Sequence, residues 1–274
     1  LGSRGLGDVY KRQVITDWGG AHDTKEAAFN GLDIEMGSYT NGLTSDNSLG
    51  YNLYYLADSY LEMLKKGELP MASVDAKARN ILRLIFRTSL NQNKPYGSLC
   101  TKEHYDVAKV IGDESIVLLR NNGILPLQAD KYNRILVVGD NAVRRLTDGG
   151  GSSELKPKDM ISPLDALRAL YGDKIEYTQG YACGRPFFGH EEEMQQTVID
   201  SLRAEAVAKA RQADVVIYVG GLNKNAFQDC ESTDRKSYNL PFSQNELIEE
   251  LVAVNPNLVI ANISGNAYAM PWLK

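Results

Sequence analysis

Two acidic residues of this sequence stand in settings that suit different chemical roles. Asp17 ends a short run of β-branched residues and is followed by Trp18 and two glycines, whereas Glu231 lies in a long polar segment. The pattern predicts that Asp17 is held rigidly at the carboxyl end of a strand and that Glu231 is carried by a mobile loop. Two carboxyl groups on opposite sides of a bond, one ionised and one protonated, can hydrolyse a glycoside. The same two acids would also suit a cleft that only binds a ligand.

The segment around Glu231, residues 215–248, is unusually long for a connection. Residues 215–219 have the β-branched composition of a buried strand, and Ser243 with Glu246 predicts a capping box at the start of a helix. About two dozen residues with no apolar period separate them, whereas α/β proteins usually join a strand to a helix in roughly 2–6 residues. A loop of this length suggests a function. Residue types alone nevertheless favour a solvated acidic loop, because most loop carboxylates lie in water.

The bulk composition narrows the class of protein. The chain has 274 residues, of which 43% are hydrophobic and 24% are charged, and this is enough for one large domain or two ordinary ones. The net charge of −5 argues against a nucleic-acid-binding surface. No apolar run approaches the roughly 18 residues that span a bilayer. The three cysteines are far apart, which indicates neither a disulfide framework nor a metal site and does not identify a compartment.

The first part of the chain reads as one repeat of a parallel α/β fold. Residues 1–13 lack any period and resemble a translated adaptor, so we exclude them from the fold. Residues 14–20 and 32–36 read as strands on either side of a helix over residues 25–30, which Thr24 is expected to cap. In such folds the carboxyl ends of strands face the ligand cleft, and Asp17 and Trp18 fall there. Three amphipathic helices are then expected, at residues 54–66, 74–90 (capped by Ser73) and 102–119.

Strands and helices alternate through the rest of the chain. Strands are expected at residues 134–139, 174–178, 214–219 and 258–263, and helices at residues 162–170, 197–212 and 244–254. This alternation predicts a mostly parallel, doubly wound sheet with right-handed crossovers. The glycine run at residues 149–153, GGGSS, matches neither phosphate-binding pattern and is a weak cofactor signal. A close backbone approach to a neighbouring domain is the simpler interpretation of it.

Several stretches resemble one known family in the same order. VITDWGG (14–20) is similar to the nucleophile segment of glycoside hydrolase family 3, in which a barrel strand ends in Ser/Thr-Asp-Trp. Residues 221–248 resemble the acid/base loop of that family, with Glu231 at the position of the general acid/base and Asp234-Arg235 as the pair that follows it. Further resemblance lies in AAFNGLDIEM (27–36), ESIVLLRNNGILPL (114–127), GGGSS (149–153) and ISGNAYAMPW (263–272).

The resemblance implies a retaining, exo-acting β-glycosidase, with a β-glucosidase expected ahead of a β-xylosidase. Asp17 would be the nucleophile, Glu231 the general acid/base, and Trp18 a wall of the subsite for the terminal sugar. The expected partner is an oligosaccharide or β-glycoside substrate. The chemistry requires no metal and no organic cofactor, and neither nucleic acid nor a membrane is expected as a partner.

The resemblance also implies the architecture. Residues 14–95 would be the C-terminal remnant of a (β/α)8 barrel with its flanking helices, residues 96–132 a linker and helix, and residues 133–274 an incomplete α/β sandwich domain. The chain is then expected to be an internal fragment that is inactive alone and that exposes apolar surface. Its longer parent would be compatible with a periplasmic or secreted location. Two alternatives stay open: a carbohydrate- or nucleotide-binding module that uses residues 149–153, and a pseudoenzyme that keeps only the fold.

Overall fold

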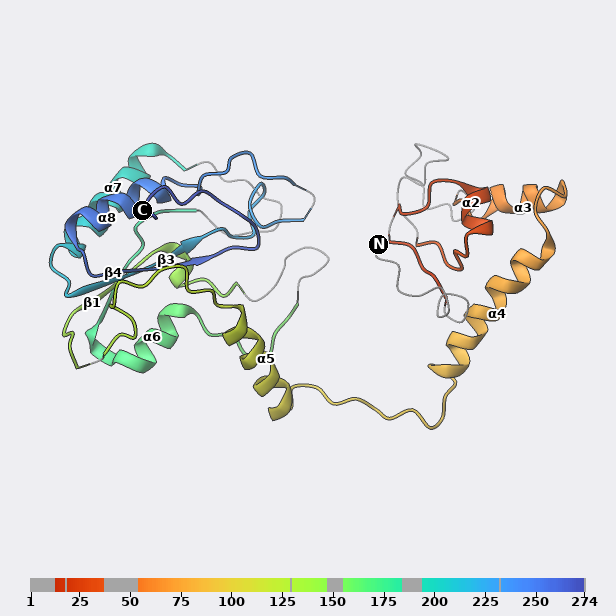
Figure 1. The fold of residues 1–274 in the computed structure, drawn as a ribbon, viewed down its shortest axis with the longest axis horizontal. Coiled ribbons are helices and arrows are strands. Elements are labelled where there is room, and N and C mark those ends of the chain that lie inside the picture. Colours follow the sequence, from red (N-terminus) through yellow and green to blue (C-terminus); the bar gives the residue numbers. More distant parts are fainter. Residues whose placement is uncertain are drawn as a thin grey trace. The chain divides into compact units, whose positions relative to one another are not determined.

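The computed structural model describes residues 13–17, 19–36, 54–128, 130–146, 155–183, 194–231 and 233–273. These residues fall into two compact units, Leu1–Leu99 and Cys100–Lys274, and each is described by itself. In Figure 1 the first unit runs from red to yellow and the second continues through green to blue.

A parallel bridge joins the two segments of the first unit that were expected to be strands. Ile15 pairs with Ile34, and helix α2, Thr24–Phe29, connects them. The Asp33 carboxylate accepts a hydrogen bond from the Val14 N–H at 2.9 Å and so supports the pairing. Strand, helix and parallel strand make one βα repeat, although among the described residues the pairing is an isolated bridge rather than a ladder.

The cap expected for α2 is wrong. Asp23 caps the helix, because its carboxylate accepts a hydrogen bond from the Glu26 N–H at 2.7 Å. The Thr24 hydroxyl instead donates to the Tyr55 carbonyl at 3.0 Å, inside the unit. Both residue types cap helices well, so the tertiary contact of Thr24 decides which of the two does so here.

The next two helices also begin elsewhere than expected. Helix α3 is Asp58–Lys65, shorter than the expected span, and helix α4 is Met71–Arg87. Pro70 occupies the N-cap position of α4, so Ser73 lies in the first turn, where its hydroxyl donates to the Pro70 carbonyl at 2.7 Å. The prediction that Ser73 caps this helix is therefore wrong.

A buried lysine of α4 caps the C-terminal end of α2. Lys77 is only 8% exposed, and its Nζ donates to the carbonyls of Ala27 and Ala28 at 3.3 Å each and to that of Leu32. The last carbonyls of a helix have no partner within it, so the ammonium group satisfies this end of α2 as a C-terminal cap. Burial lowers the pKa of Lys77.

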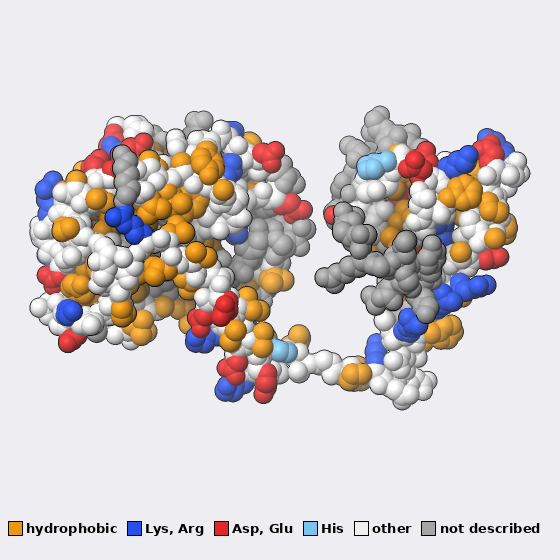
Figure 2. All heavy atoms as spheres, viewed as in Figure 1, with side chains coloured by type: hydrophobic (Ala, Val, Ile, Leu, Met, Phe, Trp, Pro, Cys, Tyr) orange, Lys and Arg blue, Asp and Glu red, His pale blue; other side chains and the backbone are white. Residues whose placement is uncertain are grey.

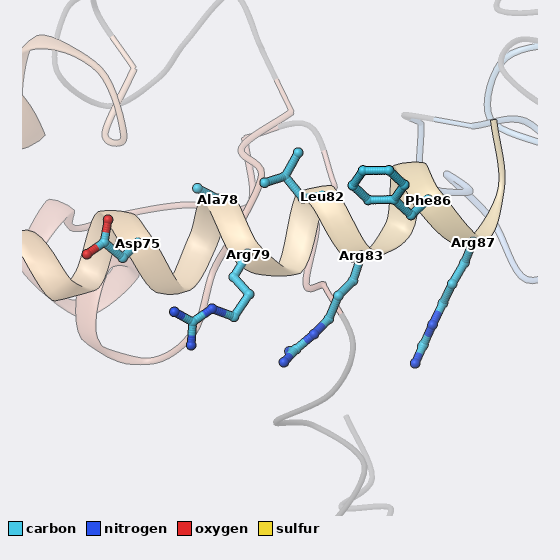
Figure 3. A pocket seen from close by; sticks show the side chains of 7 residues that line it. All are labelled: Asp75, Ala78, Arg79, Leu82, Arg83, Phe86 and Arg87. Carbon is cyan, nitrogen blue, oxygen red and sulfur yellow. The ribbon is translucent and has the colours of Figure 1, made fainter. Parts of the chain in front are cut away.

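One face of α4 carries exposed apolar side chains. Leu82 and Phe86 are 51% and 63% exposed. Figure 3 shows Ala78, Leu82 and Phe86 along one side of the helix, with three arginines extending from the other side, and together they line a shallow hollow: Arg79, Arg83 and Arg87. Figure 2 shows apolar and basic side chains next to one another over this helix. The helix thus keeps the amphipathic period expected from the sequence, and Leu82 and Phe86 on its apolar face are exposed.

Replacing both Leu82 and Phe86 by Gln should raise the soluble yield of the chain while leaving its helical circular dichroism unchanged. Exposed apolar surface promotes association, and Gln keeps good helix propensity. The matched control is Leu69→Gln at a position only 3% exposed, which should lower the free energy of unfolding by roughly 3 kcal/mol. Equal soluble yields for the double variant and the parent chain would contradict this prediction.

The second unit is built on a parallel sheet with strand order β2-β1-β3-β4. The strands are Ile135–Val138 (β1), Ile175–Thr178 (β2), Val215–Gly221 (β3) and Leu258–Ile263 (β4). Each lies within about two residues of its expected span, because runs of β-branched residues mark buried parallel strands clearly. The expected α/β alternation and parallel sheet are confirmed.

Helices cover both faces of this sheet (Figure 1). Helices α7 (Gln196–Ala210) and α8 (Gln244–Val254) pack on one face and α6 (Pro163–Tyr171) on the other. Alternate residues of each strand supply the two cores: Val216 and Tyr218 face α7 and α8, whereas Val215 and Ile217 face the α6 side. The period of two in a pleated strand produces this division.

Local hydrogen bonds and backbone conformation set the ends of two helices in this unit. Ser162 and Asp165 form a capping box at the start of α6. Helix α5 is Lys102–Ser115 and ends before the expected residue 119, because Ile116 adopts an extended conformation at the start of a β-branched, apolar stretch. Two short 3-10 helices, η2 (Asp140–Ala142) and η4 (Gly172–Lys174), complete the unit. None of the described helices is long and apolar enough to cross a membrane.

Candidate active site

The carboxyl ends of the four parallel strands lie along one edge of the sheet, which is where ligands bind in open α/β proteins. Helix η2 follows β1, residues 179–183 follow β2, and residues 264–267 follow β4. Residues 222–243, called the acid loop here, follow β3 and include Glu231. The acid loop therefore emerges between the segments that follow its neighbouring strands.

Two glycines allow the strands to approach closely at this edge. Gly221 has φ +112°, and a Cβ there would lie 2.1 Å from the Ile263 carbonyl oxygen. Gly139 has φ +131°, and a Cβ there would lie 1.9 Å from the Val219 carbonyl oxygen. Any other residue would both strain the backbone and push the strand ends apart.

A single buried side chain closes the neck of the acid loop. Gln244 is fully buried, and its Oε1 accepts hydrogen bonds from the Tyr218 hydroxyl at 2.6 Å and from the Gly221 N–H at 2.8 Å. Its Nε2 donates to the carbonyls of Gly221 at 2.9 Å and Pro241 at 3.0 Å. The amide thus uses all four of its hydrogen-bonding positions and joins the two ends of the loop.

The capping box expected at Ser243 and Glu246 is wrong. Ser243 has φ +53°, in the left-handed region, and its side chain makes no cap hydrogen bond. The preceding Phe242 also has positive φ, +60°, so the chain turns sharply into α8. The hydrogen bonds of Gln244 to Tyr218, Gly221 and Pro241 hold the chain in this turn. The spacing of Ser243 and Glu246 is that of a capping box, but the capping box does not form.

The base of the acid loop is folded on itself and buried. The Asn223 N–H donates to Gln228 Oε1 at 3.1 Å, and the Asn225 N–H donates to Asn223 Oδ1 at 2.8 Å. These three residues are 3%, 1% and 8% exposed for Asn223, Asn225 and Gln228. Buried polar groups with satisfied partners rigidify a segment, so this part of the loop is not the simple solvated segment that residue types suggested.

A buried carboxylate organises the segments on the other side of the loop base. Asp140 is 1% exposed and accepts hydrogen bonds from Arg144 Nε at 2.6 Å, Gln179 Nε2 at 3.0 Å and Cys183 Sγ at 2.8 Å. The Cys183 carbonyl in turn accepts from Asn225 Nδ2 at 3.0 Å. The ends of β1 and β2 are thereby linked to the base of the acid loop. Asp140 is not predicted from the sequence, where its only signal is an acid that closely follows a buried strand.

Burial, and after it the charge of Asp140, raises the pKa of the Cys183 thiol from 9.0 to about 12. The thiol therefore stays protonated at neutral pH and acts as a hydrogen-bond donor. Cys100 is exposed and Cys230 is half-buried, and none of the three cysteines forms a disulfide bond.

The Cys183 contribution to stability should decline in alkaline solution. An unfolded thiol loses its proton near pH 9.0 whereas the folded one keeps it to about 12, so the stabilisation is complete below pH 9 and is lost as the pH rises toward 12. Urea titrations of the parent chain and Cys183→Ser should therefore differ most below pH 9 and converge above it. Cys100→Ser, at an exposed cysteine, is the control for the substitution itself and should change the free energy of unfolding by less than about 0.5 kcal/mol.

The structure places the two expected catalytic acids at exposed positions of separate units. Asp17 follows the bridged segment, where the Thr16 N–H donates to the Ile34 carbonyl at 3.1 Å and Thr16 Oγ1 accepts from the Met36 N–H at 2.9 Å. The Gly20 N–H donates to the Asp17 carbonyl at 3.0 Å, which closes a turn after the acid. Trp18 and residues 149–153 lie outside the described residues.

Glu231 is exposed in the middle of the acid loop, in a segment called the crest here (residues 229–231 and 233–235). The Cys230 thiol donates to the Glu231 carbonyl at 3.3 Å. The Glu231 carboxyl group can therefore meet a ligand from solvent. Within the described part of the chain, no group of three His, Cys, Asp or Glu side chains could hold a metal ion.

Comparison with known proteins assigns the family. The sequence model of the Glycosyl hydrolase family 3 C-terminal domain matches residues 116–274, a range that includes the whole acid loop. The chain is 58% identical over 267 residues to the beta-glucosidase BoGH3A of Bacteroides ovatus, a match that covers 95% of this chain and 36% of that relative. The chain belongs to glycosyl hydrolase family 3.

Other relatives are more distant. An exo-alpha-(1->6)-L-arabinopyranosidase of Bifidobacterium breve is 30% identical over 95% of this chain and 32% of its own length. The crystal structure of a GH3 beta-glucosidase from Bifidobacterium adolescentis matches with a TM-score of 0.71 and 28% identity, over 94% of this chain and 34% of that one. The family-3 chain thus spans about a third of the length of these relatives.

Proposed function

We propose that this family-3 chain supplies the two catalytic carboxyl groups of a retaining, exo-acting β-glucosidase. The observation that carries the proposal is the 58% identity to a beta-glucosidase over 95% of the chain. A β-glucoside is proposed ahead of other sugars because identity to the arabinopyranosidase falls to 30%. The buried, hydrogen-bonded base of the acid loop supports the proposal, because a general acid must be held in place to act.

The reaction would proceed by double displacement. An Asp17 carboxylate oxygen attacks the anomeric carbon while the Glu231 carboxyl donates its proton to the departing oxygen, so that one C–O bond forms as the other breaks. The Glu231 carboxylate then takes a proton from water, whose oxygen displaces Asp17 from the sugar and restores both groups. Retention requires the two carboxyl groups to lie roughly 5–5.5 Å apart. Trp18 would form a wall of the subsite for the terminal sugar.

Residues 14–95 are proposed to be part of a (β/α)8 barrel, with residues 96–132 as linker and helix and residues 133–274 as the sandwich domain. The parallel bridge between Ile15 and Ile34 around α2 supports the barrel assignment, since strand, helix and parallel strand are its repeating element. In that fold the carboxyl ends of strands carry the catalytic groups, and Asp17 directly follows such a segment.

Covalent labelling tests the proposed function. In a chimera in which this chain replaces the matching segment of BoGH3A, a slowly reacting deoxyfluoroglucoside should leave one sugar on the peptide that contains Asp17, detected by mass spectrometry. The chain alone spans about a third of such relatives, and we expect it to show neither label nor turnover. Turnover by the chain alone, abolished by Asp17→Asn, would refute the expected inactivity. An active chimera with no label on Asp17 would refute the proposed nucleophile.

A further inference from the structure

Two side chains that flank Glu231 bind the same residue after β4. Asp229 lies two positions before Glu231, and its Oδ1 accepts a hydrogen bond from Asn266 Nδ2 at 2.6 Å. Arg235 lies four positions after Glu231, and its Nη1 donates to Asn266 Oδ1 at 2.9 Å. The amide of Asn266 therefore uses one donor and one acceptor to join both sides of the crest of the acid loop.

Backbone contacts of the same segment reinforce these bonds. The Gly265 N–H donates to Asp229 Oδ2 at 2.6 Å, and Arg235 also donates to the carbonyl of Ala267. A Cβ at Gly265 would lie 3.3 Å from the Asp229 carboxyl group, so the backbone lies close against that carboxylate. Hydrogen bonds with one charged partner are the stronger kind, and each of these has one.

These contacts use polar atoms of Asp229 and Arg235 that would otherwise suggest a ligand site. One carboxylate oxygen of Asp229 accepts from Gly265 and the other accepts from Asn266. The Arg235 guanidinium donates to Asn266 Oδ1 and to the Ala267 carbonyl, and its Nη2 donates to the Asn239 carbonyl at 3.0 Å. Asp229 and Arg235 thus hold the acid loop in place. Between them in the sequence, both Glu231 and Asp234 are exposed acids.

We propose that Asn266 is a positioning residue that fixes the crest of the acid loop and, through it, the carboxyl group of Glu231. The inference rests on the proposed role of Glu231 as the general acid/base. Proton transfer requires the acid within hydrogen-bond reach of the departing oxygen, so loss of the crest geometry should slow reactions that depend on that proton.

The Cys230 thiol, next to Glu231, gives a readout that needs no activity. Cys100→Ser removes the exposed thiol, and Cys183 is buried with a pKa of about 12, so neither position reacts readily with dithiobis(nitrobenzoate). In this variant the rate of labelling therefore measures the accessibility of Cys230. Asn266→Ala should raise the labelling rate of Cys230 roughly tenfold, because two charge-assisted bonds that hold the crest are lost. Asn257→Ala is the matched control: it loses a side-chain bond of 3.1 Å to the Asp214 carbonyl, at the opposite end of β4, and should leave the rate unchanged. Equal rates in the two variants would overturn the proposal.

Exchange of two groups provides a rescue. Asn266→Asp places its new carboxylate against that of Asp229, so it should open the crest as Asn266→Ala does. Adding Asp229→Asn to this variant again pairs an amide donor with a carboxylate acceptor. In the double variant the new amide at position 229 can donate to the new carboxylate at position 266, whose other oxygen still accepts from Arg235. The double variant should therefore label at nearly the parent rate. A double variant that labels as fast as Asn266→Asp would show that the pairing does not hold the crest.

Leaving-group dependence in the chimera connects the crest to catalysis. Asn266→Ala should lower kcat/KM for phenyl β-glucoside roughly 10- to 100-fold but change that for dinitrophenyl β-glucoside little, because only the poorer leaving group needs the proton. Equal losses on both substrates would reduce Asn266 to a structural residue. Inactivity of the unmodified chimera would count against the proposed function instead, while the thiol rates would still decide whether Asn266 holds the crest.

Discussion

Asp17→Asn in the chimera is expected to lower kcat/KM for dinitrophenyl β-glucoside by roughly 10⁴- to 10⁶-fold, as removal of a nucleophile does in other covalent enzymes. An amide of nearly the same shape lacks the charge that attacks the anomeric carbon. The loss should be as large for a good leaving group as for a poor one, because formation of the glycosyl-enzyme is prevented in both cases. Steady-state kinetics with the two aryl glucosides measures this directly.

Asp23→Asn is the matched control for Asp17→Asn. Asp23 lies six positions further along the chain, and Asn caps helices as well as Asp does, so α2 should persist and kcat/KM should stay within about twofold. A similar loss in both variants would point to damage to the fold of the first unit rather than to loss of the nucleophile. Thermal unfolding of the two variants separates these outcomes.

Glu231→Gln should separate the two steps of the reaction. The kcat/KM for phenyl β-glucoside should fall by roughly 10²- to 10⁴-fold, because its leaving group needs the proton, whereas that for dinitrophenyl β-glucoside should fall far less. The glycosyl-enzyme should then accumulate, since no base activates water. Added azide should restore turnover and yield a β-glycosyl azide, because this anion attacks without a general base.

The matched control for Glu231→Gln makes the same change at Glu246, a residue in the first turn of α8. Its kinetics on both aryl glucosides should equal those of the unmodified chimera. Failure of azide to rescue Glu231→Gln, in a variant that still folds, would assign the acid/base role to another residue.

The sheet of the second unit could be predicted from the sequence because its central strands are buried on both faces. Runs such as Ile135–Val138 and Val215–Gly221 are β-branched and apolar, and their alternation with helices allows few topologies. Helix starts were less predictable. At Thr24, Ser73 and Ser243 the sequence offers a good capping residue, but none of the three side chains caps its helix. Asp23 caps α2 in place of Thr24, the Ser73 hydroxyl donates to the Pro70 carbonyl, and Ser243 makes no cap hydrogen bond.

The candidate site was predictable only in part. The settings of Asp17 and Glu231 and the family resemblance lead to the proposal of these two acids, whereas the residues that hold the acid loop have no periodic signal in the sequence. Asp229 and Asn266 are separated by 37 positions, and both lie in irregular segments. Their pairing depends on β3 and β4 being neighbours in the sheet, a fact that a single sequence does not contain.

The closed neck at Gln244 has a consequence for engineering substrate preference. Because one amide joins Gly221 to Pro241, residues 222–243 form a cassette that could be transplanted between related sheets without redesigning the strands. Its crest, however, is anchored on Asn266, outside the cassette. A graft that exchanges residues 222–243 together with 264–267 should keep the Glu231 carboxyl group in its original position. A graft of the loop alone would keep the loop ends joined but would leave the position of that carboxyl group undefined.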